Sequence, residues 1–179
     1  MQHGNVTSTR RTSSRAAEGR SDQITRHRSK VLVVSDSVHA GIRADTSGLA
    51  LARVLEEVGF EVVESRVVPD GIVPVASALR EMTRGFAGLV VSTGGTGFSA
   101  SDVTPEATRS LLEREAPGLS EAMRAVTPRG RLSRGVTGTI GLSLVVNVPG
   151  STQAAVESIE AILEVVPHAL ELLTGGRPH

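Results

Sequence analysis

The sequence has no cysteine, no tryptophan and no tyrosine, and only three phenylalanines among its 179 residues. Without cysteine, the chain forms no disulfide, no iron–sulfur cluster, no thiolate nucleophile and no cysteine-ligated zinc site. The shortage of aromatic rings removes most of the side chains on which nucleic-acid bases stack. These absences exclude several classes of redox and metal chemistry, and they weigh against nucleic acid as a partner.

Lysine and histidine are scarce as well. The single lysine is Lys30, next to the N-terminal segment, so the rest of the chain has no P-loop or Schiff-base lysine. His39 and His168 are the only histidines away from the two terminal segments, and no HExxH pattern occurs, so a histidine-rich metal site is not expected. The groups that remain are Asp, Glu, Ser, Thr, Arg and backbone amides, which together with an oxygen-preferring cation suit phosphate chemistry.

Charge is unevenly distributed along the chain. The formal net charge is zero, but residues 1–30 hold seven of the 19 basic residues and two of the 19 acidic ones, about +5, which leaves the remainder at about −5. Residues 1–29 also lack apolar periodicity, so we expect a disordered basic N-terminal extension that is either inert or contacts nucleic acid or a partner protein. No apolar signal region or uninterrupted membrane span follows, so we expect a cytoplasmic protein without membrane contact.

From Val31 onward, short apolar runs alternate with amphipathic stretches. This alternation is typical of an α/β domain with a mostly parallel sheet, and we expect one domain over residues 30–179. The predicted strands cover residues 31–35, 60–68, 88–92, 136–140 and 142–148, and the last two, divided by Gly141, are candidates for a hairpin. The predicted helices cover residues 51–58, 72–84, 104–115, 118–126 and 151–174, the last of them bent or restarted near Pro167.

Ligands bind beyond the carboxyl ends of the strands in an open α/β sheet, so the residues after each predicted strand indicate where a site would lie. These segments are Asp36-Ser37, Pro69-Asp70-Gly71, Thr93-Gly94-Gly95-Thr96-Gly97 with Asp102, and Pro149-Gly150-Ser151. All four aspartates between residues 30 and 179 fall in such loops, whereas the glutamates lie mainly in helical or strand segments. Aspartate also prefers turns and helix caps for structural reasons, so both interpretations stay open at this point.

The loop at residues 93–97 reads TGGTG and follows a buried strand. Its three glycines let the backbone approach a ligand closely and point N–H groups inward, so such a loop can hold a phosphate. It has neither a P-loop lysine nor GxGxxG spacing, and a tight strand-to-helix turn explains it equally well. Asp102, just before the helix start Thr104-Pro105-Glu106, is either a helix cap or a ligand of a divalent cation.

The order of these segments resembles the signature of the Mog/MoaB family of molybdopterin-binding proteins, because TGGTG is followed after a short spacer by DVTPEA at residues 102–107. The resemblance extends from about residue 31 to residue 173. It includes SD and DTSG at residues 35–36 and 45–48, VVPD at 67–70, PG at 117–118, MR at 123–124, LSRG at 132–135 and NVPGS at 147–151.

The resemblance implies a three-layer α/β/α domain with a mostly parallel sheet and one antiparallel strand, assembled as a homotrimer or a hexamer. The implied activity is that of a molybdopterin adenylyltransferase: Mg²⁺-dependent transfer of AMP from ATP to the terminal phosphate of molybdopterin, giving adenylyl-molybdopterin and pyrophosphate. Contact with the molybdenum insertase of the same pathway is the implied protein partnership.

By motif match, Asp70 and Asp102 correspond to the family's two essential carboxylates, and we expect them to be the catalytic residues and the Mg²⁺ ligands. The glycine loop and the loop at residues 149–151 match the family's phosphate contacts, and Arg134 either binds phosphate or pairs with a surface carboxylate. The residues expected to bind substrate or nucleotide are Ser35, Asp36, Thr93, Gly94, Gly95, Thr96, Gly97, Ser133, Arg134, Pro149, Gly150 and Ser151.

Two positions depart from the family pattern. Many members carry a basic residue directly before the aspartate of DVTPEA, where this chain has Ser101. The closing loop reads PGST at residues 149–152, as in the MoaB-type branch. These departures motivate an alternative hypothesis, a non-catalytic MoaB-type paralogue that binds molybdopterin or acts as a scaffold.

Overall fold

The structure, a computed structural model, describes Met1 and residues 27–176. The extension predicted over residues 1–29 therefore lies almost entirely outside the described residues. Its last two residues, Arg28 and Ser29, begin strand β1 (Arg28–Val34) and pair with strand β2 (Glu61–Val68). Strand β1 thus begins two residues before the predicted boundary at residue 30, because the backbone groups of Arg28 and Ser29 extend the ladder between β1 and β2.

Six strands form one sheet. Besides β1 and β2 they are β3 (Gly88–Thr93), β4 (Arg114–Glu115), β5 (Thr137–Ile140) and β6 (Ser143–Val148), in the order β2-β1-β3-β6-β5-β4. Strands β2, β1, β3 and β6 are parallel, whereas β5 runs antiparallel to both of its neighbours. A hairpin around Gly141 joins β5 to β6. The prediction of a mostly parallel sheet with one antiparallel strand is confirmed.

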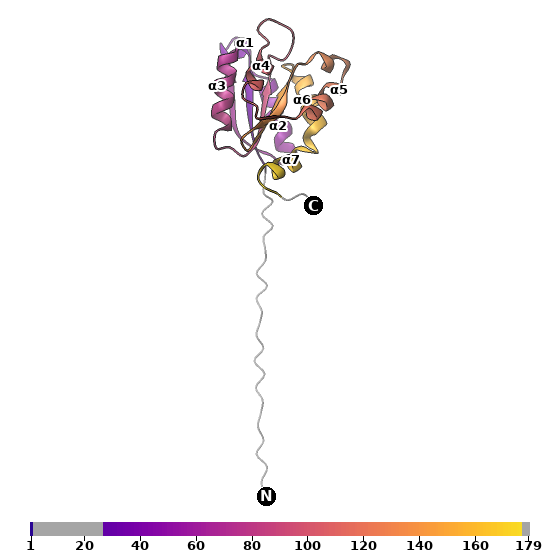
Figure 1. Ribbon diagram of the computed structural model, residues 1–179. Helices are drawn as coiled ribbons and strands as arrows, with labels where there is room; N and C mark the ends of the chain where they lie inside the picture. The colour runs from indigo at the N-terminus through magenta and orange to yellow at the C-terminus, as the bar shows by residue number, and fades with distance from the viewer. Residues whose placement is uncertain (2–26, 177–179) are drawn as a thin grey trace.

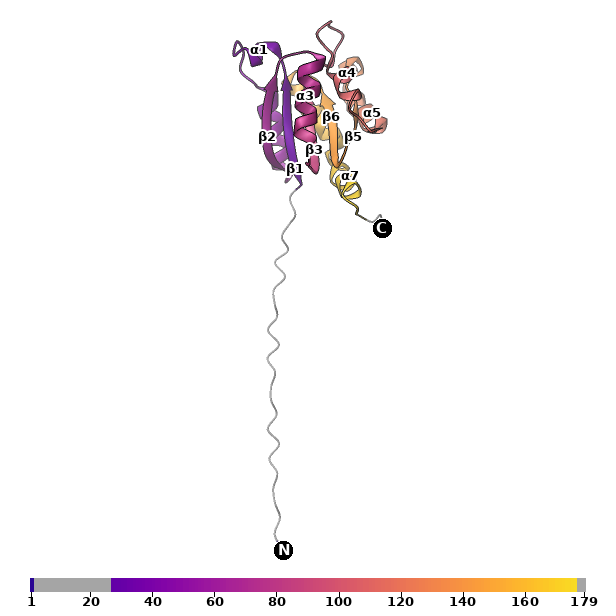
Figure 2. The same ribbon diagram turned by 60° about the vertical axis from the view of Figure 1, so that its left-hand side comes forward.

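Helices cover both faces of this sheet (Figure 1, Figure 2). Val31 and Leu32 are adjacent in β1 and therefore point to opposite faces. Val31 packs in one core cluster with Leu51 and Ile159, and Leu32 packs in a second cluster with Leu79. This is a three-layer α/β/α arrangement, as the resemblance implied. The helices are α1 (Asp36–His39), α2 (Ser47–Glu57), α3 (Ile72–Thr83), α4 (Thr104–Arg109), α5 (Pro117–Ala125), the 3₁₀ helix η1 (Pro128–Leu132), α6 (Thr152–Leu163) and α7 (Val166–Leu173).

The predicted helices agree with the structure except at their ends. The long C-terminal helix is divided into α6 and α7 just before Pro167, where the sequence predicted a bend or a restart, because proline fits the first turn of a new helix better than the interior of an old one. The short α1 and η1 were not predicted. None of the helices formed by residues 27–176 has the length and apolar content needed to cross a lipid bilayer.

The helix predicted over residues 104–115 begins as expected but ends at Arg109. Arg114 and Glu115 instead form β4, paired antiparallel with Thr139 and Gly138 of β5. A side-chain carbon on Gly138 would lie 2.2 Å from the carbonyl oxygen of Arg114, so this close pairing requires glycine. The prediction for residues 110–115 was wrong because a partner strand more than 20 residues away decides their conformation.

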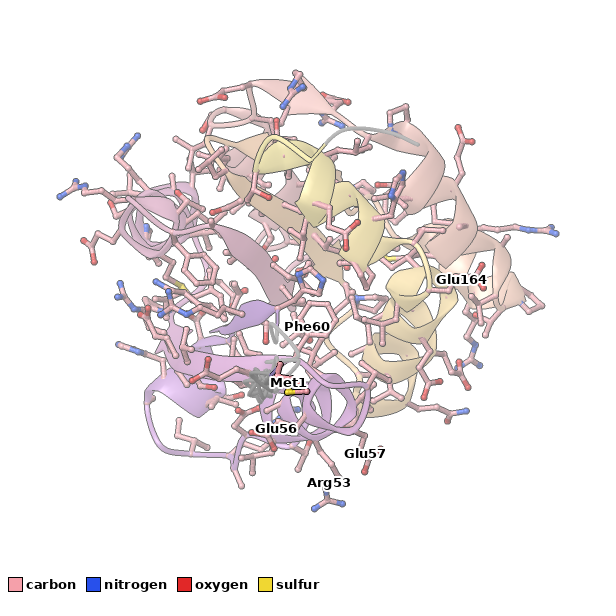
Figure 3. All side chains as sticks on the ribbon, turned by 90° about the horizontal axis from the view of Figure 1, so that it is seen from below. Met1, Arg53, Glu56, Glu57, Phe60 and Glu164 are labelled. Atoms are coloured by element: carbon pink, nitrogen blue, oxygen red, sulfur yellow. The ribbon has the colours of Figure 1, made fainter. Side chains whose placement is uncertain are left out.

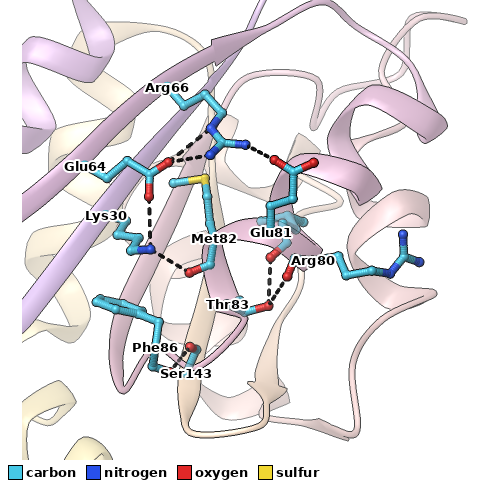
Figure 4. Close-up of polar contacts among 10 residues, drawn as sticks. Lys30, Glu64, Arg66, Arg80, Glu81, Met82, Thr83, Phe86 and Ser143 are labelled. Atoms are coloured by element: carbon cyan, nitrogen blue, oxygen red, sulfur yellow. Dashed lines mark hydrogen bonds and ion pairs between the residues drawn. The ribbon is translucent and has the colours of Figure 1, made fainter.

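The single lysine has a structural role between β1 and α3. The Lys30 ammonium group lies 3.0 Å from the Glu64 carboxylate and donates to the carbonyl oxygen of Met82 at 2.9 Å. Arg66 contacts the same carboxylate at 2.7 Å (Figure 4). Burial acts to raise the pKa of Glu64, but the hydrogen bonds from Lys30 and Arg66 outweigh it and lower the pKa.

Candidate functional site

The carboxyl ends of the parallel strands meet at one end of the sheet, beside α1 in Figure 2. The loops that follow these strands pack backbone against backbone. Ser35 donates its N–H to the carbonyl oxygen of Val68 at 3.0 Å. A side-chain carbon on Gly94 would lie 2.2 Å from the carbonyl oxygen of Val34, and one on Gly150 would lie 3.2 Å from the Cα of Gly94. Four strand exits thus converge on one small region, as expected for an open α/β sheet.

Two adjoining pockets open in this region. The larger has a volume of about 550 Å³ and contains Asp70 in its lining, and we call it the Asp70 pocket. The smaller has a volume of about 360 Å³ and contains Glu157 of α6 in its lining, and we call it the Glu157 pocket. Four residues line both pockets and form a shared wall between them: Gly95, Asp102, Gly150 and Ser151.

Most residues expected to bind substrate line one of these pockets. Besides the shared wall, the Asp70 pocket is lined by Ser35, Thr93 and Gly94. The Glu157 pocket is lined by Thr96, Gly97, Ser133 and Pro149. Asp36 and Arg134 line neither pocket. The charged lining residues that the sequence interpretation missed are Arg43 in the Asp70 pocket, and Arg129 and Glu157 in the Glu157 pocket.

Only one of these missed residues left a signal in the sequence. Ala154, Glu157 and Ser158 follow Ser151 at helical spacing and lie on one face of α6 toward the Glu157 pocket. The helical spacing from Ser151, which begins α6 at a candidate phosphate loop, therefore indicated that Glu157 lies near the site. Arg43 lies in an irregular loop, where no periodicity indicates which way a side chain points.

Asp36 and Asp70 hold each other through their main chains. The N–H of Asp36 donates to Oδ2 of Asp70 at 2.9 Å, and the N–H of Asp70 donates to Oδ1 of Asp36 at 3.0 Å. The second oxygen of Asp70, Oδ1, faces the glycine loop, because a side-chain carbon on Gly95 would lie 3.4 Å from it. Asp36 therefore orients Asp70, and the Asp70 carboxylate retains an oxygen on the pocket side.

Asp102 lies in the shared wall. Its Oδ2 accepts a hydrogen bond from the N–H of Ser99 at 2.7 Å and lies close to Gly97. Helix α4 has Val103 as its N-cap and no side-chain cap, so Asp102 does not cap this helix. Its Oδ1 accepts no hydrogen bond from the described residues, and this leaves one oxygen for a ligand.

The glycine loop has two consecutive glycines in the left-handed region, Gly94 with φ of 103° and Gly95 with φ of 61°. A side-chain carbon on Gly95 would lie 2.4 Å from the Thr104 hydroxyl. Within the described part of the chain, that hydroxyl is the one buried side-chain polar atom without a hydrogen-bond partner. Thr93 connects the loop to the β6 exit by donating its hydroxyl to the carbonyl oxygen of Pro149 at 2.7 Å. The loop therefore presents bare backbone at the shared wall.

Arg134 supports this loop from outside the pockets. Its guanidinium donates to the carbonyl oxygens of Gly97, at 2.7 Å, and Asp102, and it forms an ion pair with Glu106 of α4. The hydrogen bond from Arg134 lowers the pKa of Glu106 and outweighs partial burial, which acts to raise it. The sequence left two roles open for Arg134, and the structure contains the pairing with a carboxylate.

The carboxylates of the Asp70 pocket are the side chains that could bind Mg²⁺. Within residues 27–176, no three His, Cys, Asp or Glu side chains lie close enough together to hold a metal ion. Asp70 and Asp102 line one pocket as a pair of carboxylates. Mg²⁺ is commonly bound by one or two carboxylates, with substrate phosphates and water supplying the other ligands. The pair therefore fits a magnesium ion that binds together with a phosphorylated substrate.

Comparison with known proteins agrees with this geometry. A family model described as a probable molybdopterin binding domain matches residues 30–168. The molybdopterin adenylyltransferase of Helicobacter pylori strain J99 is 34% identical over 153 residues, which cover 82% of this chain and 87% of that protein. The solved structure of the molybdopterin biosynthesis enzyme MoaB from Thermus thermophilus is 47% identical, with a TM-score of 0.79, and the match covers 85% of this chain and 98% of that one.

The chain also matches parts of larger proteins. It spans 25% of the molybdenum cofactor synthesis protein cinnamon from Drosophila melanogaster, with 39% identity over 150 residues. It spans 22% of gephyrin from Dictyostelium discoideum, with 34% identity over 157 residues. Because the family model and relatives of similar size match most of its length, the chain belongs to the molybdopterin-binding domain family.

Proposed function

We propose that the chain is a nucleotidyltransferase of molybdenum cofactor biosynthesis, which transfers AMP from ATP to the terminal phosphate of molybdopterin. The observation that carries this proposal is the position of Asp102 in a wall shared by two pockets. Two separate substrates can each occupy one pocket and meet at that wall. The relatives named molybdopterin adenylyltransferases, from Helicobacter pylori and Escherichia coli among others, support the same reaction.

In this reaction, an oxygen of the molybdopterin phosphate attacks the α-phosphorus of ATP and forms a new P–O bond. The bond between the α-phosphorus and the oxygen that bridges to the β-phosphorus breaks, and pyrophosphate leaves with that electron pair. A phosphate monoester is mostly deprotonated near neutral pH, since its second pKa is about 6. The attacking oxygen therefore needs no general base, which agrees with the absence of histidine among the described residues that line the two pockets.

The protein's task is then to hold two polyanions in line and offset their charge. The backbone of Gly95 and Gly150 in the shared wall allows close approach of phosphate. Ser151 is the N-cap of the 12-residue helix α6, whose first N–H groups and dipole favour an anion at the same wall. Asp70 and Asp102 would hold Mg²⁺, which when bound supplies positive charge to the reacting phosphates.

The two pockets suit different parts of the substrates. The Glu157 pocket combines the apolar side chains of Met123, Val126 and Leu132 with the Glu157 carboxylate. A pterin ring has an amino group beside a ring N–H, a pair of donors that one carboxylate accepts together. This favours the pterin in the Glu157 pocket and the phosphates of ATP in the Asp70 pocket.

Release of pyrophosphate tests the proposal directly. The purified protein is incubated with molybdopterin, ATP and Mg²⁺, and we expect pyrophosphate to appear only when all three are present. Asp102→Asn keeps an acceptor for the Ser99 N–H but removes the negative charge, and we expect it to release pyrophosphate on the order of 100-fold more slowly. Tight molybdopterin binding without pyrophosphate release would refute the proposal and favour the non-catalytic paralogue.

A further inference from the structure

The lining of the Asp70 pocket contains two carboxylate residues, Asp70 and Asp102, and one cationic residue, Arg43. A triphosphate entering this pocket brings several negative charges close to the two aspartates, and this repulsion must be offset. Among the described residues that line the pocket, Arg43 alone carries positive charge. It lies in the loop between α1 and α2, between the family motifs at residues 35–36 and 45–48.

The loop that carries Arg43 is attached to the domain on both sides. The N–H groups of Ile42 and Arg43 both donate to the carbonyl oxygen of Ser37, at 2.9 and 3.1 Å. At the other end of the loop, the Thr46 hydroxyl is hydrogen-bonded to the Thr152 hydroxyl of α6 at 2.8 Å. These contacts hold the backbone of Arg43 at the rim of the pocket, so only its side chain has to become ordered when a ligand binds.

The side chain of Arg43 is exposed at the surface of the domain. Arg66, Arg109 and Arg134 each form an ion pair with a glutamate. None of the ion pairs or side-chain hydrogen bonds within residues 27–176 involves the side chain of Arg43, which is exposed. Its N–H donors therefore remain for a ligand, and a guanidinium matches two phosphate oxygens at once.

We propose that Arg43 binds the β- and γ-phosphates of ATP, the pair that leaves as pyrophosphate. This inference rests on the proposed adenylyl transfer. The reacting α-phosphate must lie at the shared wall, because only there can a substrate in the Glu157 pocket reach it. Arg43 lines the Asp70 pocket but not that wall, so it meets the phosphates on the far side of the bond that breaks.

Calorimetric titrations of ATP with Mg²⁺, pyrophosphate with Mg²⁺, and AMP test the assignment. We compare the unmodified chain with Arg43→Gln, Arg43→Lys and Arg53→Gln. Arg53 is a matched control because it is also exposed but points outward from α2 (Figure 3). We expect Arg43→Gln to weaken binding of ATP and of pyrophosphate by roughly 10- to 100-fold. AMP binding should be unchanged in Arg43→Gln. Arg43→Lys should bind ATP and pyrophosphate with intermediate affinity, because lysine keeps the positive charge but lacks the paired N–H donors of a guanidinium. Arg53→Gln should match the unmodified chain.

The outcomes separate this inference from the proposed function. Equal binding of ATP and pyrophosphate by the unmodified chain and Arg43→Gln overturns the role of Arg43, as does an equal loss for AMP. If pyrophosphate binds through Arg43 but none is produced from ATP and molybdopterin, the binding role stands and the proposed reaction falls. If the unmodified chain binds neither ATP nor pyrophosphate, both are refuted. Because Arg43 is exposed, circular dichroism should show Arg43→Gln to be folded.

Discussion

Asp36 and Asp70 are joined by two reciprocal hydrogen bonds, each from the backbone N–H of one residue to the carboxylate of the other, at 2.9 and 3.0 Å. The two residues are 34 positions apart in sequence and follow neighbouring parallel strands. Of these two residues, only Asp70 lines the Asp70 pocket or the Glu157 pocket. Asp36 therefore orients Asp70, and in the proposed reaction it is a positioning residue that acts through Asp70.

Replacing Asp36 should slow the reaction, although Asp36 lines neither pocket and acts only through Asp70. Asp36→Ala removes the acceptor for the Asp70 N–H, and we expect kcat for pyrophosphate release to fall roughly 10- to 100-fold, since small displacements of a reacting group have effects of this size. Asp36→Asn keeps an acceptor oxygen and should recover most of the activity. Full activity in Asp36→Ala, measured with unchanged Tm, would show that the reciprocal bonds do not matter for Asp70.

A side chain in the glycine loop should abolish activity in a folded protein. Gly95→Ala places a carbon 2.4 Å from the Thr104 hydroxyl in a residue with φ of 61°. Gly85→Ala is the matched control, since Gly85 has φ of 62° but no atom within 4 Å of the added carbon. Both variants should lose about 1 kcal/mol or more of unfolding free energy in urea titrations. Only Gly95→Ala should lose pyrophosphate release, and equal activity in both variants would contradict close approach of phosphate at Gly95.

Glu157 should determine affinity for the pterin and not for ATP. Its carboxylate lines the smaller pocket, and its Oε1 accepts a hydrogen bond from the side chain of Gln153 at 2.8 Å. We expect Glu157→Gln to raise the Kd for molybdopterin about tenfold or more, because one acceptor oxygen becomes a donor. The Kd for ATP should stay the same. Glu160→Gln, an exposed change on the same helix, is the control, and a similar effect of both changes on molybdopterin binding would argue against the role of Glu157.

Two glutamates that form ion pairs, Glu64 and Glu106, should make stability depend on acidic pH. The pKa values of Glu64 and Glu106 are lowered below the ordinary value of 4.5. The unfolded chain, whose glutamates have ordinary values, therefore takes up protons first as the pH falls. The stabilisation is present above that ordinary value and is lost as the pH falls through it toward the lower folded value.

Thermal unfolding between about pH 7 and about pH 3 measures this effect, because the loss begins near the ordinary glutamate value and continues below it. For Glu64, burial acts to raise the pKa, and the hydrogen bonds from Lys30 and Arg66 outweigh it. We expect Glu64→Gln to lower Tm near neutral pH and to reduce the fall of Tm on acidification. Glu56→Gln, an exposed change on α2 (Figure 3), should leave the profile as it is. A profile for Glu64→Gln that parallels the unmodified chain would rule out this contribution.

Several features of the site could be predicted because they follow from local sequence and one general rule. Apolar runs of strand length alternate with amphipathic helical segments, and parallel strands have their carboxyl ends at the same end of a sheet. These two facts were enough to expect Asp70, Asp102 and the glycine loop in one region, and the structure brings them to one pocket. The family resemblance was confirmed by the match over residues 30–168.

Other features could not be predicted, because distant residues decide them. Arg134 contacts groups 28 to 37 positions away in sequence, so the sequence left its role open between phosphate and carboxylate. In the sequence, residues 114 and 115 continue the pattern of the helix that begins at Thr104. Only their pairing with β5 makes them a strand. Arg43 faces a pocket only because contacts with Ser37 and α6 fix its loop.

The amino-acid sequence by itself determined the order of the longer strands and helices, the family, and the residue types available for chemistry, since these depend on periodicity, motif spacing and composition. Tertiary structure alone decided that two pockets share a wall at Asp102, that Asp36 orients Asp70, and that Arg43 and Glu157 line separate pockets. The physical reason is that a pocket is formed by side chains from separate elements, and their directions are fixed only when those elements pack.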